Sequence, residues 1–321
     1  MKNILICERF AYEAQLKLSQ NKNFAVSSYS SDKLESANAL IIRSKFEITQ
    51  EVLDKTKNLE VIVTCTSGFE HIDLEATQKR NITVMFAPDA NAQAAAEHTW
   101  ALLLAATRHI PAASKELKTG IWNRDPHCGT ELNNKTIGIV GLGRIGSLVA
   151  KFAHAFNMEV LAFDPYVDQA TFANANAIRA SYEEVLKQAD ILTFHVPATK
   201  ETKNMFNRSH IEIVQPNLTL INTSRGQVLH EDDLVIALNE NKIKFAALDV
   251  FSKEPLTKDS KLLKCKNVLL TPHLGAYTEE AFLKASLEGA KRVIEFFESN
   301  KTQNTLPLKN DWGSLSFAER T

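Results

Sequence analysis

Three polar clusters in the second half of the chain carry side chains suited to acid and base chemistry. An arginine guanidinium matches the two oxygens of a carboxylate, and a histidine can take up or release a proton near neutral pH. Arg225 and His273 have these properties, and Glu254 can orient the imidazole and raise its pKa. This set suits hydride chemistry at a hydroxy or keto acid. The clusters read Asn222-Thr223-Ser224-Arg225-Gly226, Asp249-Val250-Phe251-Ser252-Lys253-Glu254-Pro255 and Thr271-Pro272-His273-Leu274-Gly275.

A glycine-rich turn precedes these clusters, between a strand-like run over 135–140 and an apolar-periodic helix over 145–156. Its first glycine permits a tight turn, its second lets the backbone approach a pyrophosphate, and its third lets the helix pack on the strand. The free N–H groups and the dipole at the helix start then hold phosphates. The turn reads Gly141-Leu142-Gly143-Arg144-Ile145-Gly146.

The strand expected over 159–163 ends at Asp164, which lies 18 residues after Gly146. An acid at this spacing accepts hydrogen bonds from the hydroxyls of the adenine ribose. Its charge would repel a 2′-phosphate, so the pattern favours NAD over NADP. Flavin and other adenosine-containing ligands also fit the glycine turn when it is considered alone.

Strands and helices alternate along the chain, which predicts an α/β fold with parallel sheets. In such sheets ligands bind beyond the carboxyl ends of the strands, where the three polar clusters are expected to converge. The expected helices before the glycine turn cover 10–20, 49–56, 73–79, 92–109 and 111–120. The expected strands cover 4–7, 39–42, 61–64, 82–85, 136–140, 159–163, 190–194, 218–222, 244–248 and 267–270.

Two domains are expected, because 321 residues exceed what one hydrophobic core usually supports. A long amphipathic helix over 278–300 is predicted to return to the N-terminal domain, which leaves the active site between the domains. The prediction is a Rossmann dinucleotide-binding domain, 99–275, inserted into a flavodoxin-like substrate-binding domain, 1–98 plus 276–321.

The composition is that of an ordinary globular protein, with 44% hydrophobic and 23% charged residues. A net charge of −1 argues against nucleic-acid partners. No apolar run is long enough for a signal peptide or a membrane span. The four cysteines form no CxxC pair and no metal-binding spacing with histidines, so reduced thiols in the cytoplasm and no metal are expected. They are Cys7, Cys65, Cys128 and Cys265.

In their order along the chain, these motifs resemble those of the D-isomer-specific 2-hydroxyacid dehydrogenase family. The resemblance covers nearly the whole chain. Besides the glycine turn, it rests on Arg43-Ser44, Gly68 to Asp73, Asn91 to Thr99, His195-Val196-Pro197, Asn222 to Gly226, Ala247 to Pro255 and Pro272 to Ala276.

The resemblance implies a role for each matching residue. Arg225 anchors the substrate carboxylate, Glu254 partners the histidine and His273 is the acid and base. Arg43, Ser67, Gly68 and Asn91 are further implied substrate contacts. The implied cofactor contacts are Gly141, Gly143, Arg144, Ile145, Gly146, Asp164, His195, Val196, Pro197, Thr223, Asp249 and Gly275. The implied cofactor is NAD, and the implied assembly is a homodimer formed through the cofactor domain.

Within the family, the stretch 108–164 is most similar to D-3-phosphoglycerate dehydrogenases. The substrate loop over 64–71 departs from the glycine-x-glycine-x-aspartate-asparagine pattern of relatives, and Asp89 and Ala198 replace a usual glycine and leucine. Recognition of a phosphate is therefore left open. A regulatory domain and serine feedback through it are not expected in a chain ending at residue 321. His98 is expected to be a packed or interface residue, and His71 to cap or pack its loop rather than to catalyse.

Three functions are compatible with these residues. The first is NAD-dependent interconversion of a D-2-hydroxy acid and its 2-keto acid, with 3-phosphoglycerate or with glyoxylate and hydroxypyruvate as substrates. The second is an NAD(H)-sensing binding protein that resembles the corepressors of the superfamily. The third is oxidation of another hydride donor, such as formate or phosphite.

Overall fold

A computed structural model describes residues 1–306 of the protein. These residues form two compact units, of which unit 1 comprises Met1–Ala92 and the described residues from Ala276 onward, and unit 2 comprises Gln93–Gly275. The change of unit falls earlier than the expected boundary after residue 98, because residues from Ala96 onward belong to a core of unit 2. Residues 307–321, which the sequence assigns to the substrate-binding domain, lie outside the described part.

Unit 1 contains a six-stranded sheet in the order β13-β5-β4-β3-β1-β2. All neighbouring strands are parallel except β13, which is antiparallel to β5. The order of the first five strands is that of a flavodoxin-like fold. The sequence did not predict β2, an edge strand with only one fully buried residue. The strands are β1 (Lys2–Ile6), β2 (Phe24–Ser28), β3 (Ala39–Ile42), β4 (Val61–Thr64), β5 (Thr83–Phe86) and β13 (Thr305–Leu306).

Alternate strand residues of unit 1 face two different hydrophobic cores, as the pleat of a strand requires. Ile4 and Ile41 face the core beneath α1 (Tyr12–Ser19) and α11 (Glu279–Ser299). Leu5 and Leu40 face the core beneath α2 (Gln50–Asp54) and α3 (Leu74–Lys79). The α11 helix packs on α1 and β4, so its predicted return to the N-terminal domain is confirmed. A short 3-10 helix covers Ser31–Lys33.

Unit 2 contains a parallel sheet of seven strands in the order β12-β11-β10-β9-β6-β7-β8. The chain starts in the middle at β6, builds outward to β8, and then returns to add β9 on the other side. This reversal defines the Rossmann switch point, beside the carboxyl end of β6. The two-residue β8 was not predicted. The strands are β6 (Thr136–Val140), β7 (Glu159–Phe163), β8 (Ile178–Arg179), β9 (Ile191–Phe194), β10 (Thr219–Asn222), β11 (Phe245–Leu248) and β12 (Val268–Leu270).

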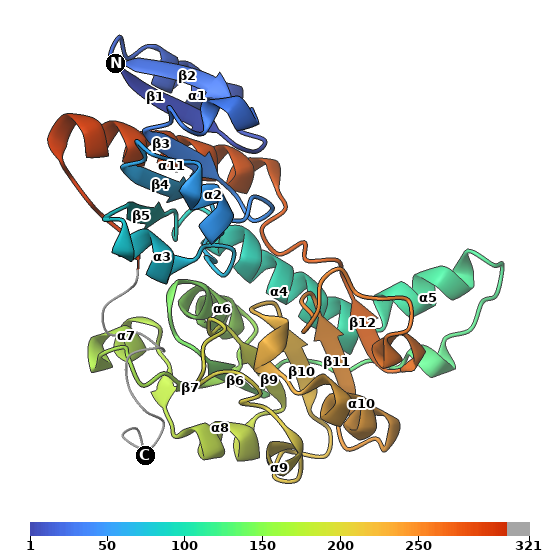
Figure 1. The fold of residues 1–321 in the computed structure, drawn as a ribbon. Coiled ribbons are helices and arrows are strands. Elements are labelled where there is room, and N and C mark those ends of the chain that lie inside the picture. Colours follow the sequence, from blue (N-terminus) through green and yellow to red (C-terminus); the bar gives the residue numbers. More distant parts are fainter. Residues whose placement is uncertain (307–321) are drawn as a thin grey trace. The chain divides into compact units, whose positions relative to one another are not determined.

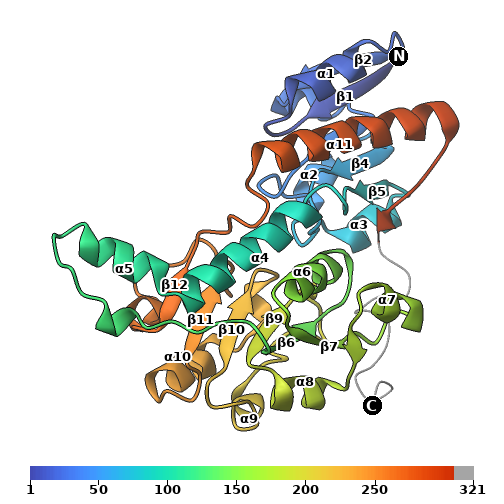
Figure 2. The ribbon, with the colours of Figure 1, turned by 180° about the vertical axis from the view of Figure 1, so that it is seen from behind.

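Helices cover both faces of the sheet in unit 2 (Figures 1 and 2). On one face lie α4 (Ala92–Thr107), α6 (Arg144–Ala155) and α7 (Gln169–Asn174). On the other lie α8 (Tyr182–Gln188), α9 (Arg208–Ile211) and α10 (Glu231–Asn239). Figure 2 shows α5 (Ile110–Leu117) projecting from the rest of this unit. Short 3-10 helices cover Asp125–His127, Gly226–Val228 and Lys261–Lys264.

Among residues 1–306, no helix combines the length and the apolar character needed to cross a bilayer.

Candidate active site

The three glycines of the turn between β6 and α6 have different surroundings. Gly141 has a φ of +96°, and a Cβ atom there would lie 2.8 Å from the carbonyl oxygen of His195. At Gly146 a Cβ atom would lie 2.0 Å from the carbonyl oxygen of Gly141. Both positions therefore need glycine to pack the protein itself. At Gly143 a Cβ atom would meet no atom of residues 1–306 within 4 Å, so the space beside this glycine at the helix start is open to them, as phosphate binding requires.

Asp164 follows β7 and holds the glycine turn in place. Its Oδ2 accepts a hydrogen bond from the Leu142 amide at 2.8 Å, and its Oδ1 accepts one from the Tyr166 amide at 2.9 Å. Burial raises the pKa of the carboxyl, although these backbone hydrogen bonds act to lower it. A carboxylate has about four lone-pair sites, so even with a further backbone hydrogen bond from Val167 the group keeps acceptor capacity for the ribose hydroxyls that the sequence predicts.

The loop after β9 faces the glycine turn across the switch point. Its backbone at His195 limits the space beside Gly141. The His195 ring lies 3.0 Å from Oγ1 of Thr193, and burial lowers the pKa of this histidine to about 3, so the ring is neutral. Val196 is buried and the carbonyl of Pro197 accepts a hydrogen bond from Thr202. These contacts fix the backbone that is predicted to line the cofactor.

The loop after β10 is shaped by the side chain of Asn222. Its Oδ1 accepts from the amide and hydroxyl of Ser224, and its Nδ2 donates to the carbonyl of Arg225 at 2.9 Å. The next residue, Gly226, touches the loop after β11, since a Cβ atom there would lie 1.8 Å from the carbonyl carbon of Phe251. This close backbone contact brings the loop of Arg225 beside the loop of Glu254.

Glu254 and His273 form the hydrogen bond that the sequence predicts. The Nδ1 atom of His273 lies 2.7 Å from Oε2 of Glu254, while Oε1 of Glu254 accepts from the Phe251 amide at 3.0 Å. Because Nδ1 is engaged, Nε2 is the ring nitrogen left for proton transfer. The structure thus brings Glu254 and His273 into contact, and places Arg225 close enough to influence the charge of both.

Electrostatics at this pair stabilise a protonated imidazole beside an ionised carboxylate. The hydrogen bond that His273 donates to Glu254 raises the pKa of His273, with burial and Arg225 acting in the opposite direction. Burial acts to raise the pKa of Glu254, but the hydrogen bonds from His273 and Phe251 outweigh it and the pKa is lowered. The pair can therefore hold a proton at neutral pH and release it when a reaction requires.

Asp249 organises the loop that carries His273. Its carbonyl accepts from the His273 amide at 2.9 Å, and its carboxylate accepts from Thr271 Oγ1 at 2.6 Å and from the amides of Leu274 and Gly275 at 2.8 Å each. Burial acts to raise the pKa of this carboxyl, yet the hydrogen bonds, including one from His98, lower it. Asp249 thus remains ionised. Its predicted contact with the nicotinamide amide stays a prediction.

Sequence reasoning assigned His98 to packing and gave no role to the side chain of Thr99. In the structure, Nε2 of His98 lies 3.2 Å from Oδ1 of Asp249. The hydroxyl of Thr99 lies 2.8 Å from the hydroxyl of Thr223. The sequence offers no signal for these contacts, because α4 is far from β10 and β11 along the chain.

The predicted substrate contacts of unit 1 lie on loops after its strands. Arg43 follows β3, and its guanidinium lies 5.2 Å from the Phe282 ring centroid. Its Nη1 is buried and has no hydrogen-bond partner within the described residues, 1–306. Asn91, after β5, has a buried Oδ1 that also has no partner in the described part of the chain. Ser67 donates to the Pro88 carbonyl at 3.4 Å, and the Gly68 carbonyl accepts from Thr66 at 2.7 Å. Buried polar atoms without partners are typical of ligand sites.

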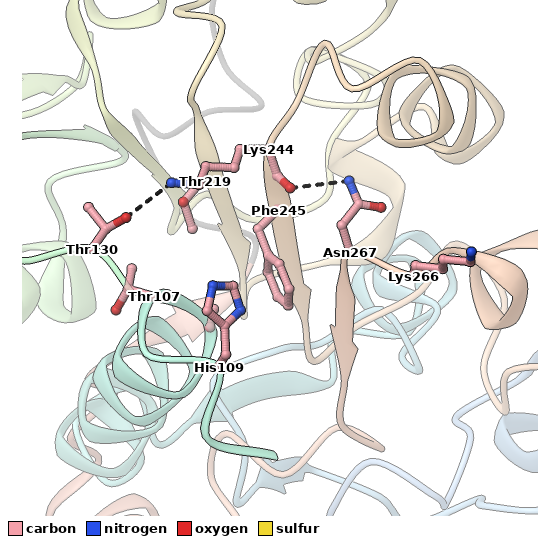
Figure 3. Close-up of a pocket in the computed structure, with 9 residues that line it drawn as sticks. Thr107, His109, Thr130, Thr219, Lys244, Phe245, Lys266 and Asn267 are labelled. Carbon is pink, nitrogen blue, oxygen red and sulfur yellow. Dashed lines mark hydrogen bonds between the residues drawn. The ribbon is translucent and has the colours of Figure 1, made fainter. Parts of the chain in front are cut away.

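A separate pocket of about 200 Å³ lies at the amino ends of β10, β11 and β12, away from the strand ends that carry Arg225 and His273. Figure 3 shows the side chains of Lys244 and Lys266 pointing in different directions, so they do not form one cationic site. Within residues 1–306, no group of three or more His, Cys, Asp or Glu side chains could hold a metal ion.

Residues 100–275 match the family described as D-isomer specific 2-hydroxyacid dehydrogenase, NAD binding domain. The chain belongs to this family. The matched range lies within unit 2, so this unit contains the family's NAD-binding domain. The range includes the glycine turn, Asp164, Arg225, Glu254 and His273. The predicted family, its fold and its NAD cofactor are confirmed.

Relatives within the 2-hydroxyacid dehydrogenase family cover most of this chain. This chain is 39% identical to D-3-phosphoglycerate dehydrogenase of Methanocaldococcus jannaschii over 280 residues. The aligned region covers 87% of this chain and 53% of that protein. This chain is also 39% identical over 277 residues to the Bacillus subtilis protein of the same name, over 86% of this chain and 53% of that protein. The chain thus spans about half the length of these curated relatives.

Among solved structures, the protein is similar to D-lactate dehydrogenase from Aquifex aeolicus, crystallised with NAD and lactic acid. The TM-score is 0.82 and the sequence identity 30%, over 93% of this chain and 96% of that chain.

Proposed function

We propose that this protein interconverts a D-2-hydroxy acid and its 2-keto acid with NAD as the hydride carrier. The observation that carries the proposal is the 2.7 Å hydrogen bond between His273 and Glu254, with Arg225 on the neighbouring loop of the same unit. This reaction needs an acid and base of raised pKa, which is His273, beside a charged group that binds the substrate carboxylate, which is the guanidinium of Arg225.

Each of these residues has a distinct part in the reaction. The Arg225 guanidinium binds the substrate carboxylate and fixes the orientation of the neighbouring carbon. In the direction of reduction, Nε2 of protonated His273 donates a proton to the carbonyl oxygen. Glu254 accepts the hydrogen bond from Nδ1 and stabilises the imidazolium. In the direction of oxidation, neutral His273 takes the proton of the hydroxyl.

The cofactor would be held by residues of unit 2. The amides at the start of α6, including those of Arg144 and Ile145, would bind its pyrophosphate, and Asp164 its adenine ribose. His195, Val196, Pro197, Thr223, Asp249 and Gly275 are the further proposed contacts. When bound, the nicotinamide ring supplies or accepts the hydride. The open space at Gly143 supports this assignment.

The proposed substrate is 3-phosphoglycerate with 3-phosphohydroxypyruvate. The names of the curated relatives support this choice, and so does Arg43, whose buried Nη1 has no hydrogen-bond partner among residues 1–306 and would suit a second anionic group. Ser67, Gly68 and Asn91 are the other proposed substrate contacts. A short unphosphorylated 2-keto acid is the alternative, supported by the solved D-lactate dehydrogenase and by the substrate loop that departs from the usual pattern.

Oxidation of NADH tests the proposal against a panel of 2-keto acids. The panel contains glyoxylate, hydroxypyruvate, 3-phosphohydroxypyruvate, pyruvate and longer 2-keto acids, each with wild type, His273→Ala and Arg225→Ala. We expect one substrate to be reduced by wild type, with kcat/KM lower by about 10² or more in both variants. Equal kcat/KM in all three proteins would contradict the assigned roles.

The same assay separates the two other functions. Binding of NADH without reduction of any 2-keto acid would favour an NAD(H)-sensing protein. Reduction of NAD with formate or phosphite would favour oxidation of another hydride donor.

We further propose a homodimer in the cytoplasm. Exposed apolar side chains on α5 and the loop after it support a partner subunit, with Leu117 54% and Trp122 81% exposed. The four cysteines are free, which suits a reducing compartment. The net charge of −1 gives no electrostatic reason to expect nucleic-acid or membrane partners.

A further inference from the structure

Two consecutive residues of α4 reach the loops that follow three strands of unit 2. The Nε2 atom of His98 lies 3.2 Å from Oδ1 of Asp249 and 3.3 Å from Oγ1 of Thr271, at the ends of β11 and β12. The Oγ1 atom of Thr99 lies 2.8 Å from Oγ1 of Thr223, at the end of β10. One short stretch of this helix therefore contacts the loops after β10, β11 and β12.

The direction of the hydrogen bonds follows from the protons available. Thr271 has one hydroxyl proton and donates it to Asp249 at 2.6 Å, so its oxygen can only accept from His98. The ionised carboxylate of Asp249 is also an acceptor only. Nε2 of His98 therefore carries a hydrogen, which it directs toward both oxygens. Thr99 donates its own proton to the Ala95 carbonyl at 2.8 Å, so it accepts from Thr223.

These contacts support the loop that carries His273. The carboxylate of Asp249 has no exposed surface, and it holds the amides of Leu274 and Gly275 at 2.8 Å each. Removal of the His98 donor leaves this buried charge with one hydrogen-bond partner fewer. The cost would fall on the geometry of the loop, since the remaining donors would have to rearrange around the carboxylate.

We propose that His98 is a positioning residue of the active site, which holds the His273 loop through Asp249, with Thr99 holding the Arg225 loop through Thr223. The catalytic part of this inference rests on the proposed function. The structural part, support of the loop, does not depend on any substrate. His98 acts on the reaction only through Asp249 and Thr271.

Three variants on α4 test the proposal. His98→Leu removes the hydrogen-bond donor, and His98→Gln keeps a donor of similar reach. Glu97→Gln is the control, because Glu97 is exposed on the same helix and bonds only to Gln93 within residues 1–306. We expect His98→Leu to lower kcat by about 10- to 100-fold, as loss of supporting contacts around a site typically does, with a smaller effect on KM. His98→Gln should recover most of kcat, and Glu97→Gln should match wild type.

Hydrogen exchange provides a readout that needs no substrate. The amides of Leu274 and Gly275 should exchange about tenfold faster in His98→Leu than in wild type, and at nearly the wild-type rate in His98→Gln. Should His98→Leu not fold, His98→Asn, whose shorter amide cannot reach Asp249, takes its place.

If His98→Leu had the amide exchange rates and the kcat of wild type, the proposal would be overturned. Equal losses in His98→Gln and His98→Leu would overturn it as well, since the donor would then be irrelevant. If wild type reduces no 2-keto acid, the proposed function fails, while the exchange of the two amides still decides whether His98 supports the loop.

Discussion

The hydrogen bond between Glu254 and His273 sets the pH range in which the imidazole carries a proton. The carboxylate raises the pKa of His273 mainly through this bond. Reduction of a keto acid needs the protonated ring and is lost as the pH rises through this pKa. Oxidation of a hydroxy acid needs the neutral ring and is lost as the pH falls through it.

Replacement of Glu254 by glutamine should shift both pH profiles. Glu254→Gln removes the negative charge, so the pKa of His273 falls, and both limbs should move to lower pH by about one unit. The measurement is kcat/KM against pH in each direction, with Glu183→Gln as the control, because this side chain of unit 2 is 65% exposed and pairs with Lys187. If the limbs of the two pH profiles stay at the wild-type pH, the role of Glu254 is contradicted.

Arg225 should not be replaceable by lysine. Arg225→Lys keeps the charge but loses the planar pair of donors that a carboxylate needs, so kcat/KM should fall about 100-fold. Binding of NADH, followed by its fluorescence, should be unchanged. Arg80→Lys, at a partly exposed arginine that pairs with Asp54 in unit 1, is the matched control. A kcat/KM near that of wild type would remove Arg225 from the site.

At the scale of elements, two glycines of the turn between β6 and α6 have different purposes. Gly141 is needed for packing of the protein, and Gly143 is needed for the approach of the cofactor. Gly141→Ala places a side chain at a φ of +96° and against His195, so we expect a loss of about 1–3 kcal/mol in unfolding free energy. Gly143→Ala enters open space, so its melting temperature should match wild type while the Kd for NADH rises about tenfold or more. Thermal unfolding and NADH titration measure the two effects. Equal melting temperatures for both variants would refute this division.

The contact between the loops after β10 and β11 depends on a third glycine. Gly226→Ala must separate its backbone from Phe251, and a displacement of about 1 Å at a catalytic group can cost about 10² in rate. We expect kcat/KM to fall by that order while NADH binding persists. A fully active variant would show that the two loops can move apart without harm to the site.

At the scale of the whole molecule, the exposed apolar side chains around α5 predict self-association. A double variant, Leu117→Ser with Trp122→Ser, should shift the sedimenting species toward the monomer. The exchange of two exposed residues for serine should leave the melting temperature of the monomer nearly unchanged. Tyr12→Ser, at a side chain of unit 1 that is 73% exposed, controls for the loss of a large apolar group. A dimer of unchanged stability would place the interface elsewhere.

The central strands and the long helices were predictable from the sequence, because burial on both faces leaves continuous apolar runs such as 39–42 and 61–64. Three edge strands, β2, β8 and β13, were not, although the edge strand β12 was predicted over 267–270. β2 has one fully buried residue and β8 has none, so neither carries the pattern that identifies a strand. The extra strands lie at sheet edges, where pairing with a single neighbour decides the structure.

By itself, the sequence determined which groups are the candidates for the chemistry, because the glycine turn, the guanidinium, the carboxylate and the imidazole each require a particular residue type at a particular place after a strand. Only the tertiary structure decided what supports them. The bond from His98 to Asp249, the approach of Gly226 to Phe251 and the anchoring of Leu142 by Asp164 join segments distant in the chain. Such contacts depend on how strands and helices pack. Local sequence patterns do not show which distant segments will touch.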